Sequence, residues 1–90
     1  MQESTRQAIT FLHQSHLLLI QALGSLKAAN RHQPCENNEA LVLNVEKSVD
    51  DVVGYMRYLL EPEYPNVWVE GEGFDMKLLQ TIILVPPTIE

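Results

Sequence analysis

The sequence predicts a mainly α-helical fold: a long antiparallel helical hairpin plus a short C-terminal helix, with two copies pairing into a four-helix bundle. Two long segments carry apolar residues at alternating intervals of three and four, which is the spacing of one helix face. A short polar segment that contains a proline separates them. The chain of 90 residues has room for one domain, which we expect to span residues 1–90.

The first helix is expected over residues 5–29. Ser4, followed three residues later by Gln7, has the pattern of a capping box at a helix start. Asn30 tolerates the backbone of a helix end, and Pro34 disfavours helix in the residue before it. The residues predicted to face the second helix are Ile9, Leu12, His16, Leu19, Leu23 and Leu26.

The second helix is expected over residues 38–60. Asn37 and Asn38 are good cap residues, and Glu39 places a negative charge in the first turn. Pro62 and Pro65 end the helix because proline lacks a backbone donor and restricts the residue before it. The residues predicted to face the first helix are Val42, Val45, Val49, Val52, Met56 and Leu59.

Residues 61–75 form an acidic segment with three aromatic side chains. Within it, residues 67–69 predict a short extended piece, and Gly71 and Gly73 predict a turn.

The C-terminal element is expected over residues 75–85 and fits two templates. Helical spacing predicts a helix capped by Asp75 and ended by Pro86 and Pro87. The many β-branched residues also allow a strand in a C-terminal β-hairpin. We favour the helix.

Charge and composition narrow the classes of partner. Six basic residues against 12 acidic ones give a net charge of -6, the wrong sign for contacting phosphates directly, so we expect no nucleic-acid partner. Cys35 is the only cysteine, which excludes an intramolecular disulfide and fits a reducing cytoplasm. No apolar run approaches the roughly 20 residues of a membrane span, and we expect neither a signal peptide nor a membrane partner.

The first helix is the best candidate for self-association. The run Leu17–Ile20 is apolar around its whole circumference, so it must be covered on several sides. We expect a homodimer, although a monomeric three-element core and an obligate complex with another protein stay open. The predicted oligomer interface consists of Phe11, Leu18, Leu19, Ala22 and Leu23.

The acidic segment is the best candidate for binding a different protein. Exposed aromatic residues among acids suit a basic partner surface. The alternative is that the aromatic rings fold back and cover the open end of the hairpin. The predicted partner-binding residues are Tyr64, Trp68, Glu70, Glu72 and Phe74.

Catalytic and metal sites have little support. His13 and His16 share a helix face, but His32 and Cys35 lie about 25 Å further along a straight helix, so one chain cannot join them around a metal. We predict that His16 lies in the seam, which is the contact between the two long helices, and that His13 lies at the surface. No nucleophile motif or complete dinucleotide loop is present. We therefore expect no catalytic residue, cofactor or metal.

The predicted function is a non-enzymatic protein–protein interaction or adaptor module that acts through the hairpin and the acidic aromatic segment. Two alternatives remain: an acidic inhibitor or antitoxin-like protein that blocks a basic surface, and a small metal-binding protein.

Overall fold

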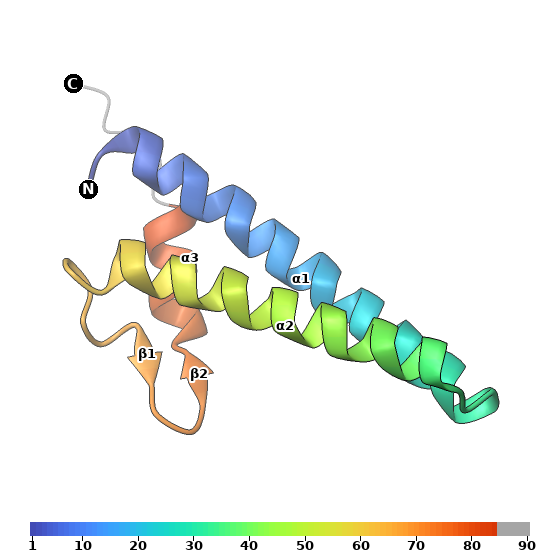
Figure 1. Ribbon diagram of the computed structural model, residues 1–90. Helices are drawn as coiled ribbons and strands as arrows, with labels where there is room; N and C mark the ends of the chain where they lie inside the picture. The colour runs from blue at the N-terminus through green and yellow to red at the C-terminus, as the bar shows by residue number, and fades with distance from the viewer. Residues whose placement is uncertain (85–90) are drawn as a thin grey trace.

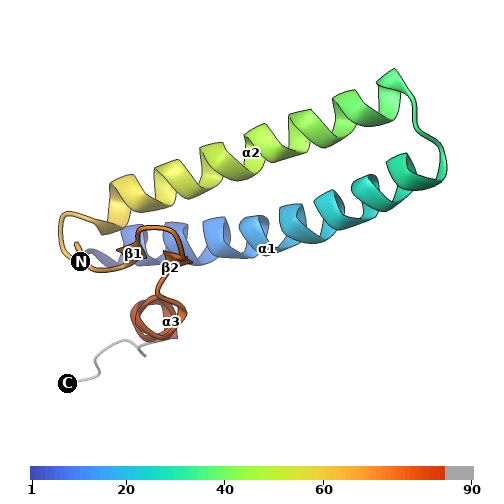
Figure 2. The same ribbon diagram turned by 90° about the horizontal axis from the view of Figure 1, so that it is seen from below.

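The computed structural model describes residues 1–84 of the chain. Its elements are α1 (Glu3–His32), α2 (Glu36–Leu60), β1 (Trp68–Val69), β2 (Gly73–Phe74) and α3 (Met76–Leu84). α1 and α2 form an antiparallel hairpin, and α3 and the strand pair lie on one side of it, at the end away from the loop between the two long helices (Figures 1 and 2). The predicted mainly α-helical fold is confirmed.

The seam between α1 and α2 also follows the prediction. Every predicted seam residue is buried or half-buried, whereas most residues between them are exposed. Ile9 and Met56 are fully buried. The two helices are also joined by an ion pair between Lys27 Nζ and Glu46 Oε2, at 3.7 Å.

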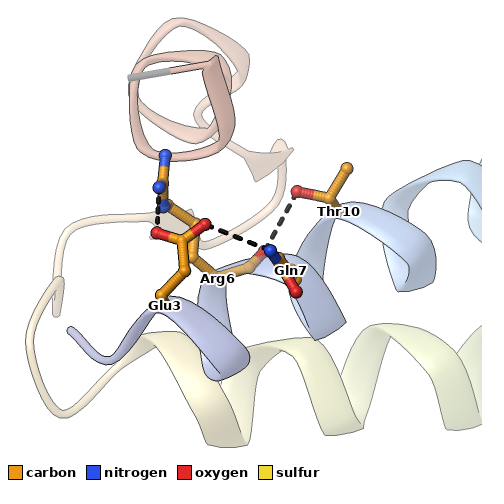
Figure 3. A network of polar contacts seen from close by, with 4 residues as sticks. All are labelled: Glu3, Arg6, Gln7 and Thr10. Carbon is orange, nitrogen blue, oxygen red and sulfur yellow. Dashed lines mark hydrogen bonds and ion pairs between the residues drawn. The ribbon is translucent and has the colours of Figure 1, made fainter. Parts of the chain in front are cut away.

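α1 begins earlier than predicted, at Glu3, and its N-cap residue Gln2 makes no side-chain cap hydrogen bond. Ser4 therefore lies inside the helix, and the expected capping box is wrong. In its place Glu3 pairs with Arg6 and accepts a hydrogen bond from Nε2 of Gln7 at 3.4 Å (Figure 3). A negative side chain in the first turn stabilises the helix start through the helix dipole.

The turn between the long helices is shorter than predicted. α1 continues to His32, and α2 already begins at Glu36 instead of at residue 38. Asn38 does not cap α2, because its side-chain Nδ2 donates a hydrogen bond across the turn to the carbonyl oxygen of Gln33 at 2.8 Å. Pro34 limits the first helix, as expected.

The predicted extended piece and glycine turn are present as a small antiparallel strand pair. Trp68 lies opposite Phe74, and Val69 lies opposite Gly73. Gly71 and Gly73 have φ values of 81° and 93°, in the left-handed region that favours glycine.

α3 confirms the predicted C-terminal helix over Met76–Leu84 and rules out a strand there. Oδ1 of Asp75 accepts a hydrogen bond from the backbone N–H of Leu78 at 3.2 Å, so Asp75 caps the helix as expected. The predicted end of this element at Val85, with Pro86 and Pro87, lies outside the described residues.

The fully buried core lies at one end of the hairpin, which we call the core end. The opposite end, at the turn, is the loop end. No described residue of α1 beyond Ile9, or of α2 before Met56, is fully buried. The molecule is long, with extents of 56 × 26 × 18 Å. The core consists of Ile9, Met56, Leu60, Val67, Leu79 and Ile82.

Candidate interaction surface

The hairpin has two broad sides, and within residues 1–84 only one of them is covered, at the core end. Each helix residue turns by about 100°, so the residues before and after a seam residue lie on opposite sides of it. On the covered side Leu60 follows Leu59 and lies in the core. Figure 3 shows Arg6 and Thr10 on the part of α1 that faces α3. We call this the α3 side.

The seam on the α3 side is flanked by charge as well as apolar residues. Lys27 follows Leu26 in α1, and Glu46 follows Val45 in α2, and these two make the interhelical ion pair. Both side chains are about half exposed, at 50% and 43%. A partner that covered this side at the loop end would have to desolvate both charges.

On the opposite side, the residues that directly precede seam residues are uncharged except for Asp51. On this side of the hairpin, the residues that directly precede a seam residue recur every seven positions in both helices. All of them are exposed, and Phe11 and Leu18 border them on α1 with 66% and 65% of their surface exposed. We call this surface the uncharged face, and define it by Ala8, Phe11, Ser15, Leu18, Ala22, Ala29, Leu41, Ser48 and Tyr55.

One charge lies at the rim of this face. Asp51 precedes the seam residue Val52 on the outer edge of α2, and its carboxylate pairs with Nζ of Lys47 at 3.1 Å. Both side chains are largely exposed, so the pair can stay in water at the edge of this face.

The uncharged face is aromatic at the core end and mostly small at the loop end. Phe11 and Tyr55 lie close in sequence to the core residues Ile9 and Met56. Beyond Leu18, the same face of α1 carries only alanine and serine side chains: Ala22, Ser25 and Ala29. The α1 part of the surface therefore changes from raised to flat along its length.

The predicted oligomer interface divides between two locations. Phe11, Leu18 and Ala22 are exposed and belong to the uncharged face. Leu19 and Leu23 are half-buried seam residues of the hairpin. The structure thus places only the first three on a surface that a partner can reach.

Sequence reasoning missed the contribution of α2 to this surface. Leu41 and Tyr55 are exposed by 48% and 52%, and Ser48 lies between them. Seam residues come in pairs that are three apart, and Val42, Val49 and Met56 are each the first of such a pair. Leu41, Ser48 and Tyr55 can be identified from the sequence because each directly precedes one of these residues.

The aromatic side chains of residues 61–75 make contacts with other parts of the same molecule. Trp68 makes an edge-to-face contact with Phe74 at 5.1 Å between ring centroids. The guanidinium carbon of Arg57 lies 4.4 Å from the centre of the Trp68 ring, which is a cation–π contact. Tyr64 and Phe74 pack against the core. These contacts correspond to the alternative in which the rings fold back onto the hairpin.

Of the five acids of the same segment, Asp75 caps α3, and the other four fall into two groups. Glu61 pairs with Arg57 at 3.1 Å, and Glu63 pairs with the amino group of Met1 at 3.1 Å. Glu70 and Glu72 lie exposed at the turn between β1 and β2 and have no ion-pair partner among residues 1–84. Of the predicted partner-binding residues, these two remain available to a basic protein.

The two helix histidines are both half-buried, so the reading of His13 as a surface residue is wrong. Their ring centroids lie 6.4 Å apart, and Nδ1 of each is buried without a hydrogen-bond partner within the described part of the chain. Burial lowers the pKa of His13. Burial, together with the charge on His13, lowers the pKa of His16.

No group of three His, Cys, Asp or Glu side chains within residues 1–84 is arranged to hold a metal ion. His32 and Cys35 are exposed at the loop end, far along α1 from the histidine pair. The four residues considered as ligands therefore do not meet.

Comparisons of the chain with protein-family models, with curated proteins and with solved structures yielded no match. Across the described residues, none of the helices combines the length and the apolar character that crossing a bilayer requires.

Proposed function

We propose that the protein is a non-enzymatic interaction module that self-associates through its uncharged face to form a four-helix bundle. The observation that carries the proposal is the charge pattern. The residues that directly precede seam residues are all exposed and, except for Asp51, uncharged, whereas the other side carries Lys27 and Glu46. A charged group is costly to remove from water, whereas alanine and large apolar side chains are not. The hydroxyl of Ser48 already donates a hydrogen bond to the carbonyl oxygen of Asn44 at 3.1 Å, which lowers the cost of burying it.

The composition of α1 supports the same surface. Between Arg6 and Lys27 the helix carries no Asp, Glu, Lys or Arg. Exposed helix faces normally carry charged residues, and a helix without them is typical of one that is covered on several sides. α2 differs, because its exposed outer positions include Lys47, Asp50 and Asp51.

A second copy would supply what the loop end lacks. Two helices alone bury one stripe each, and the loop end has no fully buried described residue. A second hairpin laid on the uncharged face adds the missing layer and removes Phe11, Leu18 and Tyr55 from water. Each such side chain contributes about 1.5 to 3 kcal/mol when fully buried.

The adaptor role rests on the acidic turn. Glu70 and Glu72 project from the α3 side and stay free when the uncharged face is occupied. They would attract a basic protein in a salt-dependent way, whereas the apolar self-association should be nearly insensitive to salt. The exposed free thiol of Cys35 suits a reducing compartment such as the cytoplasm.

The experiment compares two equally exposed positions on opposite sides of the hairpin. Phe11 on the uncharged face is 66% exposed, and Leu43, which follows Val42 and so lies on the α3 side, is 65% exposed. Phe11→Glu should reduce the mass from twice 10.2 kDa to 10.2 kDa, and Leu43→Glu should leave the dimer intact. Light scattering on a sizing column over a tenfold concentration range measures this.

Circular dichroism of both variants verifies that the helices are retained. A wild-type protein that stays monomeric over the whole concentration range would contradict self-association. A dimer that survives Phe11→Glu but dissociates with Leu43→Glu would move the interface to the α3 side.

A further inference from the structure

We infer that two copies pair antiparallel, related by a two-fold axis that passes near the middle of the uncharged face, so that the loop end of each copy lies beside the core end of the other. This inference rests on the proposed self-association and adds the orientation of one copy relative to the other. A two-fold axis lying across the hairpins, in the plane of the contact, places α1 on the partner's α1 and α2 on the partner's α2, each pair antiparallel.

The register of the two helices fits one such axis. On α1, Ala8 then faces the partner's Ala29, and Ser15 faces the partner's Ala22, so small residues meet at both levels. On α2, Tyr55 faces the partner's Leu41, and Ser48 faces the partner's Ser48. The centres of symmetry fall between Leu18 and Leu19 on α1 and at Ser48 on α2, and Leu19 and the neighbouring Val49 are equally far along their helices from the turn.

Shape favours this orientation over the parallel one. Each face is aromatic at the core end, with Phe11 and Tyr55, and mostly small on α1 at the loop end. The antiparallel arrangement places the aromatic end of one copy over the flatter end of the other. A parallel arrangement gathers four aromatic side chains at one end and separates the chains at the other, which loses packing density.

The distribution of acidic residues also favours the antiparallel orientation. Residues 61–75 carry five acids and no base, all near the core end. A parallel dimer brings both acidic segments to one end, where like charges repel. The antiparallel dimer separates them by the length of the hairpin.

The surface is large enough for a specific contact. From Ala8 to Ala29 the uncharged face is about 32 Å long, and two packed helices are about 20 Å wide. Each copy thus offers about 640 Å², and the pair buries about 1,300 Å², within the range of stable interfaces.

Two single-cysteine proteins test the orientation. The native chain carries one thiol, Cys35 at the loop end. A spin label there should give an interlabel distance near 45 Å, the length of α1, whereas a parallel dimer would give about 20 Å or less. In Cys35→Ser combined with Ser48→Cys, oxidation should link the two copies through residue 48.

The outcomes separate the two proposals. A dimer by light scattering with a short distance at Cys35 and no link through residue 48 overturns the antiparallel orientation while the self-association stands. A monomer with no dipolar coupling overturns both. Cys35→Ser combined with Leu43→Cys, which places a thiol on the α3 side, is the matched control and should not cross-link.

Discussion

The core end and the loop end of the hairpin carry similar seam residues but differ in burial. Ile9 and Met56 at the core end are fully buried, whereas Leu23 and Leu26 at the loop end are half-buried. The difference arises because α3 and the strand pair add a third layer at one end only (Figure 2). Burial in this molecule is thus determined by the number of layers and not by how apolar the helices are.

The strongest test of this contrast is the same substitution at both ends. Leu60→Ala should destabilise the fold by about 3 to 5 kcal/mol, because it leaves a cavity in the closed core. Leu23→Ala should cost about 1 to 2 kcal/mol, because the half-buried site can fill with water. Urea unfolding measures both in the Phe11→Glu background, in which the protein is expected to be monomeric and no second copy covers the loop end. Equal losses would mean that the loop end is as closed as the core end.

An intermediate effect is expected where the strand pair joins the core end. Trp68→Ala should cost about 2 kcal/mol, since the half-buried ring loses its contacts with Phe74 and Arg57. The melting temperature measures the loss, and Glu72→Ala at the exposed turn is the control expected within about 0.5 kcal/mol. An unchanged melting temperature for Trp68→Ala would assign this ring to a partner instead of to the fold.

The smallest effect concerns the junction between the two ends. The pKa of His13 and of His16 is lowered in the folded state from about 6.5, so below that pH the unfolded chain binds protons that the folded chain does not. The free energy of unfolding should therefore be highest above pH 6.5 and should decrease as the pH is lowered toward 5. Urea unfolding at several pH values measures the slope.

A double substitution of the two histidines by glutamine should flatten that slope, and His32→Gln, at an exposed position, should not. Keeping the pH above 5 avoids the range in which carboxylates titrate. A slope that persists in the double variant would locate the responsible groups elsewhere.

The helices and their register could be predicted because the periodic seam is a property of the chain itself. Each predicted seam residue, from Ile9 to Leu59, lies on the expected face. The helix starts were less predictable, because Ser4 and Asn38 are good caps in isolation but the chain pairs Glu3 with Arg6 and ties Asn38 to Gln33. Asp75 was predictable as a cap because no such competing contact exists within the described residues.

The candidate surface could be predicted only in part. Phe11, Leu18 and Ala22 stand out because they are apolar or small off the seam of α1. Tyr55 and Leu41 do not stand out in that way, since their role depends on which side α3 leaves open. The aromatic residues of residues 61–75 read as exposed anchors in sequence, but Arg57 and the core engage them in the fold.

The core joins residues that are far apart in the chain, with Ile9 on α1 packed in the same cluster as Leu79 and Ile82 on α3. Proteins are synthesised from the N-terminus, so the hairpin leaves the ribosome before α3 does. Until then Ile9, Met56 and Leu60 line an open apolar groove. We expect the nascent hairpin to be a substrate for chaperones that bind exposed apolar helices, and to lose that affinity once α3 docks.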